Sequence, residues 1–292
     1  MQINPSIQST PHPLSQLLKV FKLKVVLVML FSAAIGMLIA PHHQLTGLKM
    51  ISGLTGVGIA ACASAALNHR FDMHEDKKMA RTKQRPLAMN HINPALVEKT
   101  AAIGILFSLI LLASSNNLLS ALLTFATTVG YSVIYTKWLK PSTPQNIVIG
   151  GLSGAMPPLL GWTCITGEIA VKPLLLVLII FTWTPAHFWP LALQNQQDYA
   201  KTKWPMLPVT HGKRFTQLSI MAYALLTAAA SLLPFCIRMT GNIYLAIACM
   251  LNARWIFLCY RLWQDARRTS DVFQFSIHYI LILFCALVID QT

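Results

Sequence analysis

The residues best suited to chemistry lie in one short segment that begins at Asn68 and ends at Leu87. Asn68, Asp72 and Asp76 are spaced i, i+4, i+8, so on a helix their side chains share one face, about 6 Å apart along the axis. Mg²⁺ prefers oxygen ligands of this kind, and cationic side chains bind phosphate oxygens. The segment also holds six cations, namely Arg70, Lys77, Lys78, Arg81, Lys83 and Arg85. Together these residues predict a site for a diphosphate carried on Mg²⁺.

A second interpretation of this segment requires no ligand. Mixed charges are also typical of a solvated helix end that joins two membrane spans. A membrane anchor explains the cations, but it does not explain the acids placed among them. The 292-residue chain has only nine acidic residues, yet Asp72, Glu75 and Asp76 fall within five positions. This concentration favours the binding site.

Two arginines and two lysines are the candidates for holding phosphate oxygens. Arg81 and Arg85 lie four residues apart, before Pro86 ends any helix, so both guanidinium groups can grip a diphosphate from one side. Lys137 and Lys140 lie where a later apolar run meets a short polar connection. For these lysines, membrane anchoring and phosphate binding both remain open.

A histidine inside an apolar run is the candidate for contact with an organic substrate. His187 lies between Trp183 and Trp189, and an ionisable group at that depth faces a cavity or a partner. It could contact a flat aromatic substrate or ligate iron, or it could be a hydrogen-bonded structural residue. Asp198 is the only acid in the loop that follows and could complete a second metal site opposite Asp72. We expect His278, in the last apolar run, to be structural.

Apolar helices must position these residues, because the composition is that of an integral membrane protein. The chain is 55% hydrophobic and 11% charged, with a mean hydropathy of +0.56, whereas soluble domains carry about 25% charged residues. A spanning helix needs roughly 20 mostly apolar residues. We therefore predict an all-α bundle in one domain, residues 1–292, with a polar tail at 1–18. The nine predicted spans are about 23–40, 48–68, 95–113, 117–137, 146–165, 171–193, 215–237, 241–262 and 273–290.

The cations predict the orientation of this bundle. With a cytoplasmic N-terminus, 19 of the 23 Lys and Arg residues lie on the inner side and three on the outer side, with Arg254 inside a span. Both long polar loops, 69–94 and 194–214, then face the cytoplasm, and so does the active site. The net charge of +14 is explained by these short loops, so the expected partner is the lipid bilayer and not nucleic acid.

Small and unusual residues in the apolar runs are expected to serve packing. The six cysteines are scattered without CxxC spacing, which argues against disulfides and zinc. Pro157 and Pro158 are expected to bend the fifth span. Gly150, Gly151 and Gly154 favour close helix packing, although they would also let a bulky ligand approach the backbone.

In combination, the motifs between residues 68 and 212 closely resemble the protoheme IX farnesyltransferase branch of the UbiA superfamily of intramembrane prenyltransferases. The N-x-x-x-D-x-x-x-D run marks the superfamily. M-A-R-T-x-x-R-P-L from Met79 and H-F-W…D-Y…P-M-L-P-V from His187 are similar to the haem branch. The remaining elements are Y-T-x-x-L-K from Tyr135 with the N-I-V-I-G-G that follows, and A-x-P-P-L-x-G-W from Ala155.

The resemblance implies a UbiA-type bundle around a central cavity in a bacterial inner membrane. It also implies transfer of farnesyl from farnesyl diphosphate to the 2-vinyl group of haem B, with addition of water, to give haem O and diphosphate. Haem B is a substrate here, and Mg²⁺ is the implied cofactor. A downstream haem-modifying enzyme or a terminal oxidase assembly is an implied partner. The implied catalytic residues are Asn68, Asp72, Asp76 and Asp198, with Mg²⁺ on the three aspartates. Substrate binding falls to Arg81, Arg85, Lys137, Lys140, Asn146, His187 and Tyr199.

The chain departs from the family pattern in the segment that follows His187. Asn195 stands where the family usually has arginine, and Gln197 replaces its usual charged neighbour.

Two other functions stay open. One alternative is a UbiA-type prenyltransferase with a quinone-precursor or chlorin acceptor. The other is a polytopic transporter of an anionic solute, against which stands the lack of a line of intramembrane charges across the bilayer.

Overall fold

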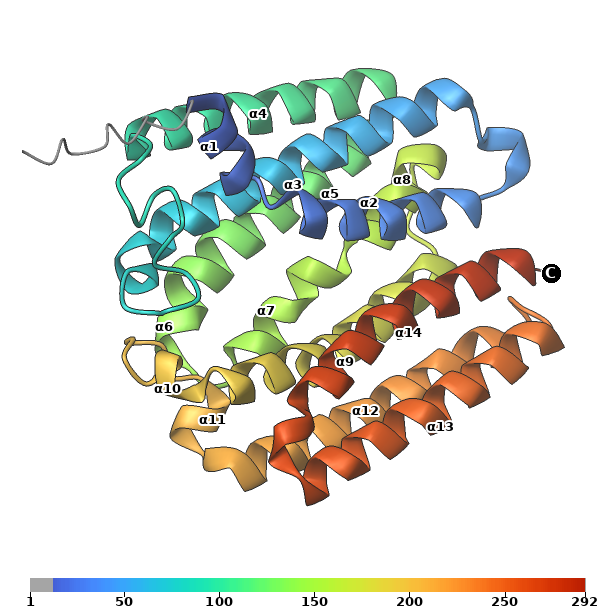
Figure 1. Ribbon diagram of the computed structural model, residues 1–292. Helices are drawn as coiled ribbons and strands as arrows, with labels where there is room; N and C mark the ends of the chain where they lie inside the picture. The colour runs from blue at the N-terminus through green and yellow to red at the C-terminus, as the bar shows by residue number, and fades with distance from the viewer. Residues whose placement is uncertain (1–12, 292) are drawn as a thin grey trace, which may run out of the picture.

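The computed structural model describes residues 13–291, which form a bundle of helices (Figure 1). Within these residues the β pairing consists of a single bridge between Thr240 and Gln291. The longer helices are α2 (Leu23–Leu38), α3 (Gly47–Asp76), α4 (Pro94–Ser115), α5 (Leu118–Val129), α7 (Asn146–Ala155), α8 (Pro157–Thr166), α9 (Val171–Gln194), α12 (Gly212–Cys236), α13 (Asn242–Gln264) and α14 (Thr269–Ile289). The shorter elements are α1 (Pro13–Val20), α6 (Lys140–Ser142), α10 (Gln196–Tyr199), α11 (Leu207–Thr210), the 3₁₀ turns η1 (His42–Gln44) and η3 (Ala266–Arg268), and the π-helical segment η2 (Gly130–Leu139).

The helices confirm a multi-pass membrane protein. Over the described residues, eight helical stretches are long and apolar enough to cross a bilayer, and α2 is a shorter apolar helix. α2 occupies the position of the first predicted span, so the count of nine spans and the cytoplasmic N-terminus stay predictions. Residues 13–18 of the predicted polar tail belong to helix α1, and residues 1–12 lie outside the described part of the chain.

Helix α3 is longer than the predicted span 48–68, and the predicted loop 69–94 begins later, after Asp76. α3 runs without interruption for 30 residues and carries Asn68, Asp72 and Asp76, which we call the acidic row. Its polar end stays helical because Asn68, Asp72 and Asp76 are buried among cations inside the protein instead of pointing into solvent. The loop that follows α3 lies at the same end of the bundle as α10 and α11 (Figure 1).

The fifth predicted span is divided into two helices directly before its two prolines, where the sequence predicts a bend. α7 ends at Ala155 and α8 begins at Pro157. Beyond the break, α8 packs backbone to backbone against α2. A Cβ atom on Gly36 would lie 1.9 Å from the carbonyl oxygen of Pro158, and one on Gly161 would lie 1.9 Å from that of Ala33. Only glycine permits this contact.

The three glycines of α7 differ from one another. A Cβ on Gly150 would lie 2.1 Å from the ring of Tyr135, and one on Gly151 would lie 3.2 Å from Thr184, so both serve close packing. A Cβ on Gly154 would meet nothing within 4 Å, and Gly154 lines the central cavity. Close packing therefore explains Gly150 and Gly151, whereas a side chain at Gly154 would extend into open space.

We predict that Gly36→Ala and Gly161→Ala each lower the free energy of unfolding by about 1–3 kcal/mol, because the added methyl group forces α2 away from α8. Thermal unfolding of the detergent-solubilised protein measures this. Gly104→Ala is the matched control, since its Cβ would meet Ile59 at an ordinary 3.5 Å. Equal stability of all three variants would contradict the backbone contact between α2 and α8.

Candidate active site

A cavity of about 640 Å³ lies inside the bundle. Its walls come from α2, α3, α5 with η2, α7, α8, α9 and α14. One end holds the charged residues of the acidic row and their partners. The remainder is lined mainly by apolar and aromatic side chains, among them Val57, Leu160 and Phe188. The cavity therefore combines a polar, charged end with an apolar chamber.

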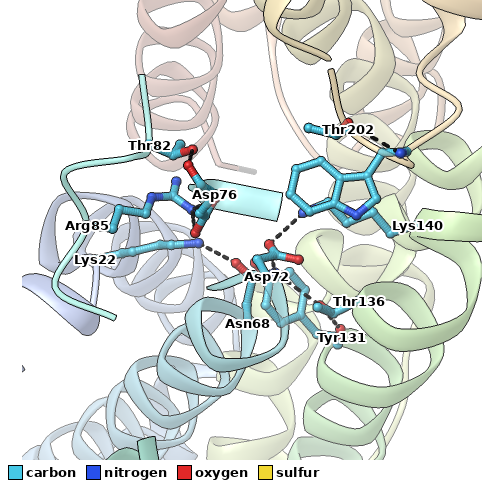
Figure 2. Close-up of polar contacts among 11 residues, drawn as sticks. Lys22, Asn68, Asp72, Asp76, Thr82, Arg85, Tyr131, Thr136, Lys140 and Thr202 are labelled. Atoms are coloured by element: carbon cyan, nitrogen blue, oxygen red, sulfur yellow. Dashed lines mark hydrogen bonds and ion pairs between the residues drawn. The ribbon is translucent and has the colours of Figure 1, made fainter. Parts of the chain in front are cut away.

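The acidic row forms the charged end as the helical spacing predicts (Figure 2). Oδ2 of Asp72 accepts hydrogen bonds from Lys140 Nζ at 2.6 Å and from Asn68 Nδ2 at 3.0 Å. Both carboxylate oxygens of Asp76 accept from Arg85 Nη1, at 3.0 and 2.9 Å. Asp72 and Asp76 are only 3% and 2% exposed, so each buried carboxylate depends on its cation for compensation.

Lys140, the first residue of α6, reaches Asp72 directly after the π-helical segment η2. In this segment the Thr136 hydroxyl donates to the carbonyl of Tyr131, five residues earlier, and accepts a hydrogen bond from Asn68. π-helical turns are rare and occur frequently at functional sites. Here the segment brings the side chains of Thr136 and Lys140 onto α3 (Figure 2).

Sequence reasoning missed one cation of this site. Lys22 stands between α1 and α2 with φ 51° and ψ 47°, a left-handed conformation that is costly for lysine. Its Nζ donates to Asn68 Oδ1 at 2.6 Å. Burial, together with the nearby positive charges of Arg85 and Lys140, lowers the pKa of Lys22 to about 7. The sequence signal was weak, because a lysine before a first apolar run is already explained as a membrane anchor.

Two loops cover the charged end. Oε2 of Glu75 accepts a hydrogen bond from the backbone N–H of Lys203 at 3.0 Å. This bond joins the end of α3 to the polar loop 194–214. Lys140 Nζ lies 3.6 Å from the ring centre of Trp204. Tyr199 and Trp204 pack with Met79 in a small apolar cluster between the loops. Glu75 thus has a structural part that its charge alone did not reveal.

The structure does not bring every candidate into the cavity. Lys137 is exposed, and Asn146 is fully buried with its amide donating to the Thr143 carbonyl at 2.6 Å. Asp198 accepts from Lys201 at 3.0 Å and from the backbone N–H of Arg81 at 3.4 Å. These hydrogen bonds, with that of Lys201 first, lower the pKa of Asp198. None of the three lines the cavity, which is bordered by Arg81, Arg85, Lys140, His187 and Tyr199.

One cavity residue is a buried phenol. Tyr199 belongs to the short helix α10 and is 3% exposed. Burial raises the pKa of its phenol, although the Arg81 guanidinium opposes this. The hydroxyl, which is protonated at neutral pH in any case, can donate a hydrogen bond into the cavity.

His187 is held at the border of the apolar chamber by three aromatic and polar neighbours. Its ring stacks between Trp183, at 4.1 Å between ring centres, and Phe273, at 4.7 Å. Nδ1 lies 2.6 Å from Ser276 Oγ. The Ser276 hydroxyl already donates to the Phe273 carbonyl at 2.6 Å, so Nδ1 must carry the proton and donate. Nε2 is then left with a free lone pair, the form that ligates a metal or accepts a hydrogen bond.

The donor set of the charged end fits Mg²⁺ on a diphosphate. Over residues 13–291 there is no cluster of three or more His, Cys, Asp or Glu side chains placed to hold a metal ion. Mg²⁺ does not require one, because it is commonly held by one or two carboxylates with the remaining ligands from phosphate oxygens and water. Asp72 and Asp76 supply two carboxylates, and Lys22, Arg85 and Lys140 supply cations for phosphate oxygens.

Comparison with known sequences identifies the family. The sequence model of the UbiA prenyltransferase family matches residues 29–286. The chain belongs to the UbiA prenyltransferase family. Curated relatives include the protoheme IX farnesyltransferase of Stutzerimonas stutzeri, 46% identical over 276 residues, which are 94% of this chain and 92% of the relative. The protoheme IX farnesyltransferase of Idiomarina loihiensis is 47% identical over 277 residues, 94% of this chain and 93% of that relative.

Solved structures confirm the UbiA fold. A digeranylgeranylglyceryl phosphate synthase superposes with a TM-score of 0.78 and 19% identity, over 95% of this chain and 98% of that chain. A UbiA homologue from Archaeoglobus fulgidus bound to DMAPP and Mg²⁺ superposes with a TM-score of 0.67 and 15% identity, over 93% and 99% of the two chains. At these identities the likeness shows the fold.

We predict that Lys22→Met weakens the binding of Mg²⁺-loaded inorganic diphosphate by about tenfold or more, because a charged hydrogen-bond donor at the acidic row is lost. Isothermal titration calorimetry on the purified protein measures the affinity. Lys19→Met is the control, since Lys19 is exposed on α1. Equal affinities of the two variants would exclude Lys22 from the diphosphate site.

Proposed function

We propose that the protein transfers the farnesyl group of farnesyl diphosphate to the 2-vinyl group of haem B, with addition of water, and releases haem O and diphosphate. The observation that carries this proposal is the identity of 46–47% to protoheme IX farnesyltransferases over 94% of the chain. The geometry supports it: a charged end suited to a diphosphate adjoins an apolar chamber suited to a prenyl chain and a flat aromatic acceptor.

The reaction begins with loss of the diphosphate from the prenyl carbon. The carbon–oxygen bond breaks, its electron pair stays with the diphosphate, and an allylic cation remains. Asp72 and Asp76 would hold Mg²⁺, which supplies charge neutralisation for the leaving group when bound. Lys22, Arg85 and Lys140 stand within contact distance of the same carboxylates and Asn68. These preplaced cations stabilise the charge that builds on the diphosphate.

The apolar chamber then protects the cation until the acceptor attacks. The π electrons of the haem vinyl group form a bond to the prenyl carbon, and the new cation on the vinyl carbon next to the ring is quenched by water. On the charged side of the chamber, the loop 194–214 is tied to the bundle by the Lys203–Glu75 hydrogen bond and by Trp204 against Lys140. Exclusion of bulk water prevents hydrolysis of the allylic cation before transfer.

His187 positions the haem in this proposal. The Ser276 contact leaves the Nε2 lone pair available, and this lone pair suits the haem iron better than a propionate, which needs a donor. Stacking against Trp183 and Phe273 holds the imidazole plane fixed.

Three further assignments belong to the same proposal. We place the protein in the bacterial inner membrane as a single domain with the active site towards the cytoplasm, which the cation asymmetry supports. Mg²⁺ is its cofactor, as UbiA homologues bound to DMAPP or GPP with Mg²⁺ suggest. Lys137, Asn146 and Asp198 keep their predicted roles as candidates, although Asp198 here contacts Lys201 and Arg81.

The deciding experiment is incubation of the purified protein with haem B, farnesyl diphosphate and Mg²⁺. The pigments are then separated, and their masses are measured by mass spectrometry. A new pigment heavier by a farnesyl group plus water supports the proposal. If no new haem pigment forms and an aromatic acid or a chlorin is farnesylated instead, the protein is a prenyltransferase with a different acceptor.

We predict that EDTA abolishes this turnover and that Asp72→Asn lowers it by at least about a hundredfold, because the negative charge that holds the metal is lost. Asparagine keeps the shape of the side chain and limits the burial of an uncompensated Lys140, which Asp72→Ala would not. The control is Asp271→Asn, an exposed acid at the start of α14. Full activity of a folded Asp72→Asn variant would contradict the metal assignment.

We predict that haem B added to the purified protein gives a shifted Soret band that His187→Ala abolishes. Ser276→Ala should weaken haem affinity by about tenfold, because loss of an outer partner loosens a metal-ligating histidine. His278→Ala serves as the control, since its Nδ1 contacts only the Gln274 carbonyl of its own helix. An unchanged haem spectrum in His187→Ala would assign His187 a structural role.

A further inference from the structure

Four hydroxyl groups line the apolar chamber without a hydrogen bond to any other group of residues 13–291. Ser64 comes from α3, Thr124 and Thr128 from α5, and Ser153 from α7. The Thr124 side chain is 2% exposed, and its Oγ1 is buried without a partner. Ser64 and Thr128 are 7% and 6% exposed. We call these four residues the hydroxyl cluster.

The lack of partners is unusual for these helices. A serine or threonine inside an apolar helix ordinarily donates to the carbonyl three or four residues earlier. Ser32, Thr127 and Thr184 line the same cavity and do so, at 3.1, 2.8 and 2.7 Å. The hydroxyl cluster therefore keeps its donors and acceptors unused, although an unpaired buried polar group costs free energy.

The hydroxyl cluster adjoins the charged end of the cavity. Ser64 precedes Asn68 by four residues on α3, so it continues the acidic row about 6 Å deeper into the chamber. Thr124 and Thr128 are also four residues apart and share one face of α5. Ser153 Oγ lies beside Gly130, where a Cβ would be only 2.8 Å away. Ser64 and Asn68 line the same cavity, so the hydroxyl nearest the charged end lies one helical turn from it.

Unpaired hydroxyls in a roomy cavity bind water. A buried water needs two to four polar partners and a space of its own volume, and a cavity of about 640 Å³ provides the space. We propose that the hydroxyl cluster holds the water that adds to the vinyl carbon of the acceptor. This inference rests on the proposed function, because the proposed reaction consumes one water inside a chamber that otherwise excludes it.

The proposed step balances as follows. After the vinyl group has bonded to the prenyl carbon, the cation lies on the vinyl carbon attached to the porphyrin ring. A lone pair of the held water forms the new carbon–oxygen bond, and the water proton passes to the released diphosphate. Without the held water, the cation loses a proton from its neighbouring carbon to the diphosphate, and an alkene forms. The position of the water thus decides between a hydroxylated and a dehydrated pigment.

The test compares the products of variants that remove hydroxyls but keep volume. The variants are Thr124→Val, Thr128→Val, Ser64→Ala, Ser153→Ala and a combined Thr124→Val/Thr128→Val enzyme. Each is incubated with haem B, farnesyl diphosphate and Mg²⁺ in oxygen-18 water, and the pigments are resolved by mass. Thr127→Val is the matched control, because its hydroxyl lies on the same helix and cavity wall but already donates to the Leu123 carbonyl.

We expect the ratio of dehydrated to hydroxylated pigment to rise several-fold in single variants and on the order of tenfold in the combined one, since each lost hydrogen bond loosens the water. The total of farnesylated haem should change less than this ratio, and Thr127→Val should match the wild type. The hydroxyl oxygen in the wild-type product should carry the isotope.

Two results would overturn the inference. An unchanged product ratio with weaker haem binding would show that the hydroxyl cluster binds the acceptor itself. An unchanged ratio with unchanged binding would show that it binds nothing that the reaction uses. If the wild-type enzyme farnesylates no haem, the proposed function is wrong, and the water step is excluded with it. This result differs from an unchanged product ratio, which leaves the proposed function intact.

Discussion

The compensation of buried negative charge on α3 governs this structure. Asp72 and Asp76 lie in a membrane protein with almost no exposure to solvent, and a buried carboxylate that loses its partner destabilises the fold by about 3–5 kcal/mol. The ion-pair partners are Arg85 in the loop after α3 and Lys140 directly after η2, and Lys22 before α2 donates to the neighbouring Asn68. Their convergence determines how the N-terminal helices and the first loop are arranged around α3.

The same compensation prepares the site for its ligand. In the proposed function, the cations that neutralise the acids in the free protein lie beside the proposed diphosphate position, and they exchange carboxylate oxygens for phosphate oxygens when the substrate and its metal bind. The acidic residues and their cations lie at one end of the cavity, and the chamber beyond it is mainly apolar, with the hydroxyl cluster and His187 among its polar groups. A substrate with a charged head and a hydrocarbon chain is therefore oriented by the cavity before any specific contact to the acceptor is made.

The helix packing that builds the chamber depends on residues far from the charged end. Gly36 and Gly161 let the backbones of α2 and α8 touch, and the break at Pro157 redirects the chain between α7 and α8. On the opposite wall, Ser276 of α14 orients His187 of α9. The loop 194–214 is joined to the end of α3 through Lys203 and Glu75. These contacts join helices from both halves of the chain around one cavity.

The amino-acid sequence by itself determined the membrane class, most of the spans, the helix break at the prolines and the shared face of Asn68, Asp72 and Asp76. These features follow from hydropathy and from the helical repeat, which are local properties. Only the tertiary structure decided which cations pair with the acids, the place of Asp198 outside the cavity, the tautomer of His187 and the unpaired hydroxyls of α5. Lys22 meets Asn68 across 46 positions, and Glu75 meets Lys203 across 128. Such pairings depend on how distant helices pack, and no spacing within one helix encodes them.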